Sequence, residues 1–217
     1  VVLVTEDLRN GNGRAIKSKL WSPERVDKLE EPINAIFYLM KDPSMPPIVK
    51  VKGSVLSSAM GAALATKRTT AERLAPGVDP DALVFESYAN PFRTYPLAND
   101  YEKFKDLFEN ENVDCYILNT GFFVDKKITK EVTLSCIEAV VEGTAQFKKW
   151  NNFSDLEIME VEGFVPDMTD TKYHGLLEAR LKDRAEFIKS RETFKEGYDK
   201  LPDEALEAVE KLIAELK

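Results

Sequence analysis

The sequence contains very few of the residues that build metal centres and disulfide frameworks. It has one histidine, His174, and two cysteines, Cys115 and Cys136, among its 217 residues. The cysteines have no C-x-x-C spacing, and both fall in segments that we expect to be buried, so zinc binding is disfavoured. Free core thiols in a reducing cytoplasm are the simplest interpretation, and we expect His174 to be a structural or solvent-exposed residue.

Several motifs of catalysis and phosphate binding are also absent. No glycine precedes a lysine, which excludes the P-loop pattern G-x-x-x-x-G-K-[ST], and neither G-x-S-x-G nor H-E-x-x-H occurs. Gly11-x-Gly13 lacks the third glycine of a dinucleotide fingerprint. Carboxylates are abundant, but no pair is set apart as a general acid and base. On its own residues, the chain does not have the signature of a complete enzyme.

The chain has neither a long apolar run nor an excess of positive charge. No stretch approaches the roughly 20 apolar residues of a membrane span, and no basic segment precedes an apolar one as in a signal peptide. The formal net charge is −8. An acidic protein repels nucleic-acid phosphates unless it carries a concentrated basic patch, and we find only three lysines within five positions. We therefore expect neither a membrane nor a nucleic-acid partner.

The composition is that of an ordinary folded protein, with 43% hydrophobic and 31% charged residues. A chain of 217 residues is long enough for one large domain or two small ones with a sizeable core. It begins Val-Val-Leu-Val without an initiator methionine. We therefore expect a piece of a longer polypeptide.

The segment from Val113 to Thr133 has the clearest organisation. Residues 113–118 predict a buried strand, Asn119-Thr120-Gly121 predicts a turn and a loop, and Thr129 predicts the N-cap of a helix that ends near Gly143. A strand, a loop and a helix N-terminus can present backbone N–H groups to an anion or a nucleotide. The positive charge of this segment comes from Lys126, Lys127 and Lys130. An ordinary strand-to-helix crossover with solvated lysines is the alternative.

Further strands are predicted on both sides of this segment. Residues 33–40 are almost continuously apolar, which fits a strand buried on both faces. Residues 156–161 alternate between apolar and acidic side chains, which is typical of a half-exposed edge strand. Shorter candidates are 1–5 and 83–85, and the polar residues 6–19 predict a loop.

Helices are predicted by apolar residues at helical spacing and by capping residues. A short one opens at Ser22-Pro23-Glu24, and a second runs from Ser54 to about Lys67. Asn99 and Glu102 have the spacing of a capping box for the next helix. Two closing helices cover 171–188 and 202–217.

Strands followed by helices along most of the length indicate an α/β or α+β fold, with a mixed sheet flanked by helices and a helical C-terminal region. We expect a single domain over residues 1–217. Within it, residues 1–150 form an α/β core, and residues 151–217 form an edge strand and the closing helices.

Four short stretches, taken in order, resemble the ATP-dependent phosphoenolpyruvate carboxykinases. Residues 34–42 and 45–51 resemble that family's strand and "LPPVSRL" segment, and residues 65–67 and 83–92 resemble "GTE … FSACFGAPF". Further along, residues 116–122 resemble "LVNTGW", and residues 126–129, followed by Thr133, resemble "GKRISI..T". The helix before "LVNTGW" and the two closing helices also fit. The resemblance covers nearly the whole chain, as the C-terminal lobe of such an enzyme.

The resemblance implies four candidate site residues. Lys127, Ile128 and Thr133 match the positions that border the adenine, and Lys50 stands where the family has an arginine that contacts phosphate and substrate. A lysine lacks the bidentate guanidinium fork, so this replacement is not neutral. The glycine-rich insert after "NTGW" is missing, because residues 123–125 lead directly into the lysines, and the loop over the nucleotide is shorter.

The resemblance also implies an activity for the whole protein: a gluconeogenic, cytoplasmic carboxy-lyase that converts oxaloacetate and ATP to phosphoenolpyruvate, ADP and CO2 with Mg²⁺ or Mn²⁺. The family's P-loop and metal ligands lie upstream of this region. The partner of the chain would therefore be the N-terminal part of the same polypeptide, and the chain alone should be inert. Whether it works as an enzyme is thus left open by the sequence.

Two other interpretations compete with this one. The first is a non-catalytic nucleotide-binding or regulatory module on the same scaffold, favoured by Lys50 and the shortened loop. The second is an unrelated α/β interaction domain, in which the lysines at 126, 127 and 130 would not converge with Lys50 on one cleft.

Overall fold

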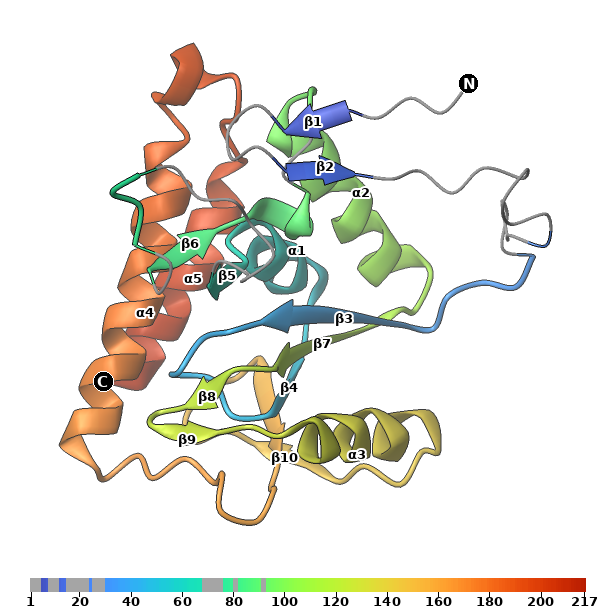
Figure 1. The fold of residues 1–217 in the computed structure, drawn as a ribbon, viewed down its shortest axis with the longest axis vertical. Helices are drawn as coiled ribbons and strands as arrows, with labels where there is room; N and C mark the ends of the chain where they lie inside the picture. Colours follow the sequence, from blue (N-terminus) through green and yellow to red (C-terminus); the bar gives the residue numbers. More distant parts are fainter. Residues whose placement is uncertain are drawn as a thin grey trace.

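The computed structural model describes residues 5–7, 12–14, 24, 30–67, 76–79, 82–90 and 93–217. The helix predicted to open at Ser22 falls outside this part apart from Glu24, and so does most of the strand predicted over 1–5. In the described part, a five-stranded mixed sheet lies at the centre with helices on both faces, which confirms the predicted fold class (Figure 1). Its strands, in the order in which they lie side by side, are β10 (Phe147–Lys149), β11 (Leu156–Met159), β4 (Ile48–Val51), β7 (Asp114–Asn119) and β3 (Ala35–Met40).

The sheet is mixed because β3 runs parallel to β7, whereas the other neighbouring pairs are antiparallel. Three two-stranded antiparallel sheets accompany it in the part of the chain that the structure describes. They are β1 (Thr5–Asp7) with β2 (Asn12–Arg14), β5 (Ala65–Lys67) with β6 (Leu83–Phe85), and β8 (Phe122–Phe123) with β9 (Lys126–Lys127). The first of these corrects the predicted loop over residues 6–19, where residues 6–7 pair with 12–13.

The helices of the described part are α1 (Ser54–Ala62), α2 (Leu97–Asn110), α3 (Lys130–Val141), α4 (Thr171–Ser190) and α5 (Asp203–Leu216), with short 3₁₀ turns η1 (Ser87–Ala89) and η2 (Phe194–Gly197). Alternation along β7 divides the core between two layers. Tyr116 and Leu118 pack with Cys136 of α3, while Cys115 and Ile117 belong to the larger core that includes residues of α1, α4 and α5.

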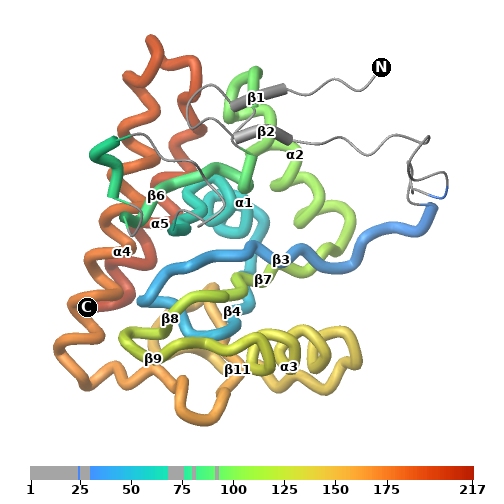
Figure 2. Tube along the Cα trace, in the orientation of Figure 1, coloured from blue at the N-terminus to red at the C-terminus, as the bar shows by residue number. Residues whose placement is uncertain are grey.

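Helices α4 and α5 lie side by side along one edge of the molecule, and the C-terminus comes close to the first half of α4 (Figure 2). His174 makes this contact, because one of its ring nitrogens, Nε2, lies 3.0 Å from the carbonyl oxygen of Leu216. The predicted structural role of His174 is therefore confirmed. The two cysteines are free and buried, with exposed fractions of 2% for Cys115 and 0% for Cys136, also as predicted. Within the described residues, no helix has the length and apolar character needed to cross a membrane.

Two strand predictions are wrong in position. Strand β3 lies at the end of the sheet beside β7, and it is not buried on both faces, because Leu39 is 59% exposed. Strand β11 does alternate between buried and half-buried residues, but it lies between β10 and β4 and is not at the edge. The edge strand β10 was not predicted, because it has only three residues, two of them lysines, and these give no periodic pattern.

Two helix predictions also need correction. Helix α1 ends at Ala62, and residues 65–67 form β5 instead of a last helical turn, because they pair with β6. Helix α2 begins at Leu97 and has no side-chain cap from Asn99. Its first N–H, that of Leu97, donates to the carboxylate of Asp199 at 3.1 Å. The helices predicted at 171–188 and 202–217 are confirmed as α4 and α5. The division of the chain at residue 150 stays a prediction.

Candidate functional site

The strand, loop and helix predicted around residues 113–133 exist, and the loop is a tight hairpin. After β7, the chain turns at Gly121 and enters β8 and β9, with Val124 between them in the left-handed region at φ 55°. The N–H of Ile128 donates to the carbonyl oxygen of Gly121 at 2.9 Å and closes the hairpin at its base. The hydroxyl of Thr129 then accepts from the N–H of Val132 at 3.4 Å, so Thr129 is the N-cap of α3, as predicted.

Asn119, at the end of β7, holds this hairpin against the loop between β3 and β4. Its side chain is fully buried, and its amide nitrogen lies 2.7 Å, 2.6 Å and 2.8 Å from the carbonyl oxygens of Asp42, Met45 and Phe122. Its side-chain oxygen accepts from the N–H of Gly121 at 3.0 Å. A buried amide with partners on two segments fixes their relative positions, because each lost contact would leave a buried polar group unpaired.

The loop between β3 and β4 is itself held by α4. The carboxylate of Asp42 accepts from the N–H and the hydroxyl of Ser44, at 3.0 Å and 2.8 Å, and from Arg184 of α4 at 2.5 Å. Tyr173, also on α4, donates from its hydroxyl to the carbonyl oxygen of Ser44 at 2.9 Å. Helix α4 thus supports the loop that Asn119 connects to the hairpin.

Lys126 is committed to a structural contact. Its ammonium donates to the carbonyl oxygen of Gly163 at 3.1 Å and lies 4.3 Å from the ring centroid of Phe164. This joins β9 to the turn that follows β11. Lys126 therefore positions the hairpin, and its neighbour Lys127 remains on the exposed side.

The three residues that match the adenine-bordering positions have different surroundings. Lys127 is exposed on β9, and Thr133 is half-buried in the first turns of α3, with its hydroxyl donating to the carbonyl oxygen of Thr129 at 3.2 Å. Ile128 is only 3% exposed, and its side chain belongs to the larger core. The accessible surface here includes Lys127, Thr133 and Lys130; the side chain of Lys130 is 84% exposed, and its ammonium lies 3.7 Å from the carboxylate of Glu131.

The N-terminus of α3 has a positive electrostatic character. Backbone hydrogen bonding at the helix start, followed by the Thr129 hydroxyl, lowers the pKa of Glu131 below its ordinary value. Unpaired N–H groups at a helix start stabilise negative charge, and the same groups attract an anionic ligand. The exposed lysines at positions 127 and 130 add to this field.

Lys50 lies at the other end of β7. It is opposite Tyr116 on β7 and Glu157 on β11, and its ammonium is 2.9 Å from the carboxylate of Asp114 and 5.6 Å from the ring centroid of Tyr116. Asp114 begins β7, whereas the hairpin follows its last residue, Asn119. Five strand steps separate the two ends by roughly 17 Å. The Lys50 ammonium and the hairpin therefore lie toward opposite ends of β7.

Sequence reasoning missed the residues that hold the site in place, Asn119, Asp42 and Arg184. One signal was available for Arg184. It falls at helical spacing from Leu181 and Ile188, within the apolar stripe of α4, where a charged side chain needs a buried partner. No pattern marked Asp42 as that partner.

The described residues do not fit a metal site. They contain no group of three or more histidine, cysteine, aspartate or glutamate side chains placed to hold an ion. We therefore derive no step through a metal in this part of the chain. An exposed cationic surface at a helix start does fit the phosphates or the base edge of a nucleotide.

The comparisons with known proteins point to one distant relative. No protein-family model matches the chain. The phosphoenolpyruvate carboxykinase (ATP) of Aeropyrum pernix is 23% identical over 164 residues, which are 72% of this chain and 32% of that protein. The similarity is distant. The chain spans about a third of the length of this curated relative, and its α/β architecture is compatible with a lobe of that protein.

Proposed function

We propose that this chain is the nucleotide-side part of a protein related to phosphoenolpyruvate carboxykinase (ATP). The observation that carries the proposal is the unit of β7, the β8–β9 hairpin and the capped start of α3, in which a buried asparagine fixes an exposed cationic surface. The distant similarity to the Aeropyrum pernix protein supports it.

In this proposal, the hairpin and the first turns of α3 border the nucleotide. The aliphatic part of the Lys127 side chain and its ammonium contact the nucleotide, and Thr133 lies beside the base. Ile128 contributes through its backbone, because its side chain is occupied in the core. The N-terminus of α3 adds a favourable field for negative charge.

The whole protein would then convert oxaloacetate and ATP to phosphoenolpyruvate, ADP and CO2. Phosphoryl transfer requires phosphate and metal clamps, and the residues described here do not fit a metal site. Those groups would come from another part of the polypeptide, which is the partner we propose. A reducing cytoplasm suits the two free thiols.

A non-catalytic nucleotide-binding or regulatory module is the second candidate. The observation that favours it is the ion pair between Lys50 and Asp114, because a lysine held by a carboxylate has less charge to offer a phosphate. In this alternative, the chain binds the nucleotide at the hairpin, and no turnover follows.

The decisive experiment is a calorimetric titration of this chain with MgATP. We expect saturable binding that weakens by about tenfold or more in the Lys127→Ala, Thr133→Ala double variant, since a charge-assisted contact is worth at least about 1.4 kcal/mol. The matched control is Lys103→Ala, Thr144→Ala, which removes the same two residue types from exposed positions elsewhere. Equal weakening by both double variants would contradict the proposed location.

The two candidates are separated by an activity assay on the full-length gene product. ATP-dependent release of CO2 from oxaloacetate supports the enzyme. Nucleotide binding without CO2 release supports the module. A full-length protein that neither binds MgATP nor releases CO2 would overturn both.

A further inference from the structure

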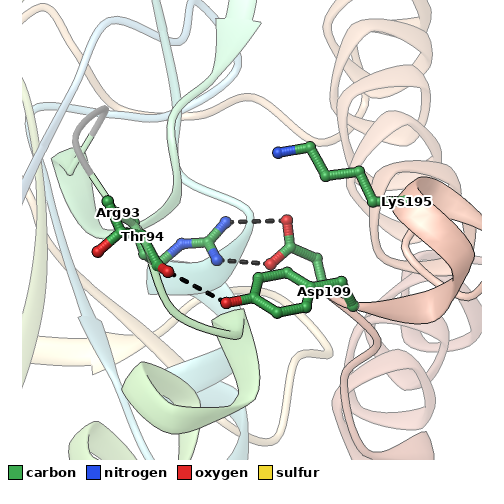
Figure 3. A pocket seen from close by; sticks show the side chains of 5 residues that line it. Arg93, Thr94, Lys195 and Asp199 are labelled. Atoms are coloured by element: carbon green, nitrogen blue, oxygen red, sulfur yellow. Dashed lines mark hydrogen bonds and ion pairs between the residues drawn. The ribbon is translucent and has the colours of Figure 1, made fainter.

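A second site candidate lies far from the hairpin in sequence, where the segment that enters α2 meets the turn between α4 and α5. It is an open hollow of about 410 Å³, lined by Arg93, Thr94, Lys195, Tyr198 and Asp199 (Figure 3). Pockets that bind small molecules have volumes from roughly 300 Å³ upward, so the hollow has the size for a metabolite.

One wall of the hollow is a rigid ion pair. The guanidinium of Arg93 donates to both carboxylate oxygens of Asp199, at 2.5 Å and 3.1 Å, and also to the carbonyl oxygen of Tyr95 at 2.6 Å. Burial by itself would raise the pKa of Asp199, but the hydrogen bonds from Arg93 lower it below its ordinary value. Asp199 is therefore ionised and fully engaged. Asp199 therefore holds Arg93 in position and is not available as a general acid or base.

Lys195 comes from the same side of the hollow as Asp199, and its ammonium extends toward the ion pair (Figure 3). Among the side chains that the structure describes, no carboxylate lies within 4.0 Å of it; its ammonium lies 5.2 Å from the ring centroid of Phe194 and interacts electrostatically with Asp199. The cation of Lys195 is thus available to a ligand.

The backbone that presents Lys195 is strained. Lys195 and Glu196 have left-handed conformations, with φ of 50° and 60°, and Gly197 follows at 80°. Such conformations are unfavourable for residues other than glycine, and they persist where surrounding contacts impose them, often at functional sites. Here Tyr198 imposes one of those contacts, by donating from its hydroxyl to the carbonyl oxygen of Thr94 at 3.1 Å across the hollow.

A third cation adjoins the hollow. The guanidinium of Arg191 lies 4.5 Å from the ring centroid of Phe187 and 4.2 Å from that of Phe194. The pKa of Arg191 is lowered, chiefly because the side chain is partly buried and also because Arg93 repels it. The negative charge of Asp199 opposes this lowering. Arg93, Lys195 and Arg191 bring three cations to this region, and the carboxylates of Asp199 and Asp100 are their electrostatic partners, in a chain whose formal net charge is −8. A bound anion would relieve the repulsion between the cations.

We propose that this hollow binds a small oxyanion, held by the ammonium of Lys195 against the Arg93–Asp199 wall, with Tyr198 and Thr94 as its boundaries. The group recognised is a phosphate or a carboxylate, which share negatively charged oxygens. The proposal is independent of nucleotide binding at the hairpin, since it involves different elements of the fold.

The test is a calorimetric titration of this chain with two probes at constant ionic strength: inorganic phosphate and malonate. We expect at least one probe to bind saturably, and the tighter one identifies the preferred oxyanion. Lys195→Gln should weaken that binding by about tenfold or more, because it removes a charge-assisted contact, whereas Lys195→Arg should retain it within a few-fold.

Lys200→Gln is the matched control. Lys200 lies in the same connection between α4 and α5 and loses the same charge, but it does not line the hollow and instead lies 3.8 Å from Asp203. We expect it to change affinity by less than about twofold, since exposed charges are screened. Thermal unfolding of each variant verifies that it is folded. Saturable binding by neither probe, or equal weakening by Lys195→Gln and Lys200→Gln, would overturn the proposal.

Discussion

Asp42 and Arg184 form an ion pair that solvent does not reach. The Nη2 atom of Arg184 lies 2.5 Å from the Oδ2 atom of Asp42, and both side chains are 0% exposed. Arg184 also donates to the carbonyl oxygen of Arg180 at 3.1 Å, and Asp42 accepts twice from Ser44. Removing one partner of such a pair leaves a buried charge without compensation, which is far more unfavourable than losing both.

The first prediction concerns this pair. We expect Asp42→Ala or Arg184→Leu to lower the free energy of unfolding by about 3–5 kcal/mol each, and the double variant to lose much less than the sum. Urea unfolding followed by circular dichroism measures all three. The pair of Lys182 and Glu178 on the surface of α4, at 2.7 Å, is the control, and its Glu178→Ala variant should lose far less stability than either single variant. Additive losses at positions 42 and 184 would contradict the coupling.

This pair also marks a limit of prediction from sequence. The two residues are 142 positions apart, whereas helical or strand periodicity relates only residues a few positions apart. Local patterns were therefore sufficient for α4 and α5, whose apolar residues recur at helical spacing, and for β7, which is a short apolar run. It was insufficient for the start of α2, whose cap comes from Asp199, 102 positions away.

The candidate site divides in the same way. The capped start of α3 follows from local signals, since Thr129 acts on a residue three positions on. The separation of Lys50 from Lys127 could not be derived, because it depends on the order of the strands and on which end of β7 each lysine adjoins. The resemblance implies that both lysines border one nucleotide, whereas the Lys50 ammonium lies beside the first residue of β7 and Lys127 follows its last.

The second prediction follows from that separation. We expect Lys50→Ala and Asp114→Asn to leave the affinity of this chain for MgATP within about twofold, because both residues lie at the opposite end of β7 from Lys127. Their effect on the free energy of unfolding should be at most about 1 kcal/mol, as for other partly exposed ion pairs. Calorimetry and urea unfolding measure the two quantities. A Lys50→Ala variant that binds MgATP tenfold more weakly would show that Lys50 reaches the nucleotide.

The third prediction concerns pH and Asp199, whose side chain is 4% exposed. Its pKa in the folded state lies below the ordinary value of 3.8. Burial alone would raise this pKa, but the hydrogen bonds from Arg93 lower it. At pH values above 3.8, the ordinary pKa that we take for the unfolded state, the carboxylate makes its full contribution to stability. This contribution is lost as the pH falls from 3.8 through the lower pKa of the folded state.

We expect Asp199→Asn to lower the free energy of unfolding by about 1.5–3 kcal/mol at neutral pH, since hydrogen bonds to a charged group have this worth. The difference from the wild type should shrink as the pH is lowered from neutral into the acid range. Asp183→Asn, at an exposed pair with Arg180, is the control, with a loss of at most about 0.5 kcal/mol. A difference that stays constant across this pH range would mean that the charge of Asp199 is not responsible.

The last prediction compares two exposed glycines whose replacement by alanine should have opposite effects. Gly163 has a φ of 77° and accepts the hydrogen bond from Lys126, and an added Cβ would meet the Lys126 ammonium. Gly175 lies inside α4 and has open space around it. We expect Gly163→Ala to lower the free energy of unfolding by about 1–2 kcal/mol, because alanine is strained in a left-handed conformation.

Gly175→Ala should raise it by about 0.5–1 kcal/mol, because alanine is the better helix former. Urea unfolding of both variants tests the opposite signs. Lys126→Ala in the Gly163→Ala background separates the two causes at position 163. If the collision with the ammonium is the main cause, the added Lys126→Ala substitution should restore stability. If the backbone conformation is the main cause, that substitution should restore none. We expect the second result, because the end of a lysine side chain moves aside readily, whereas the positive φ of residue 163 is fixed by the turn that follows β11.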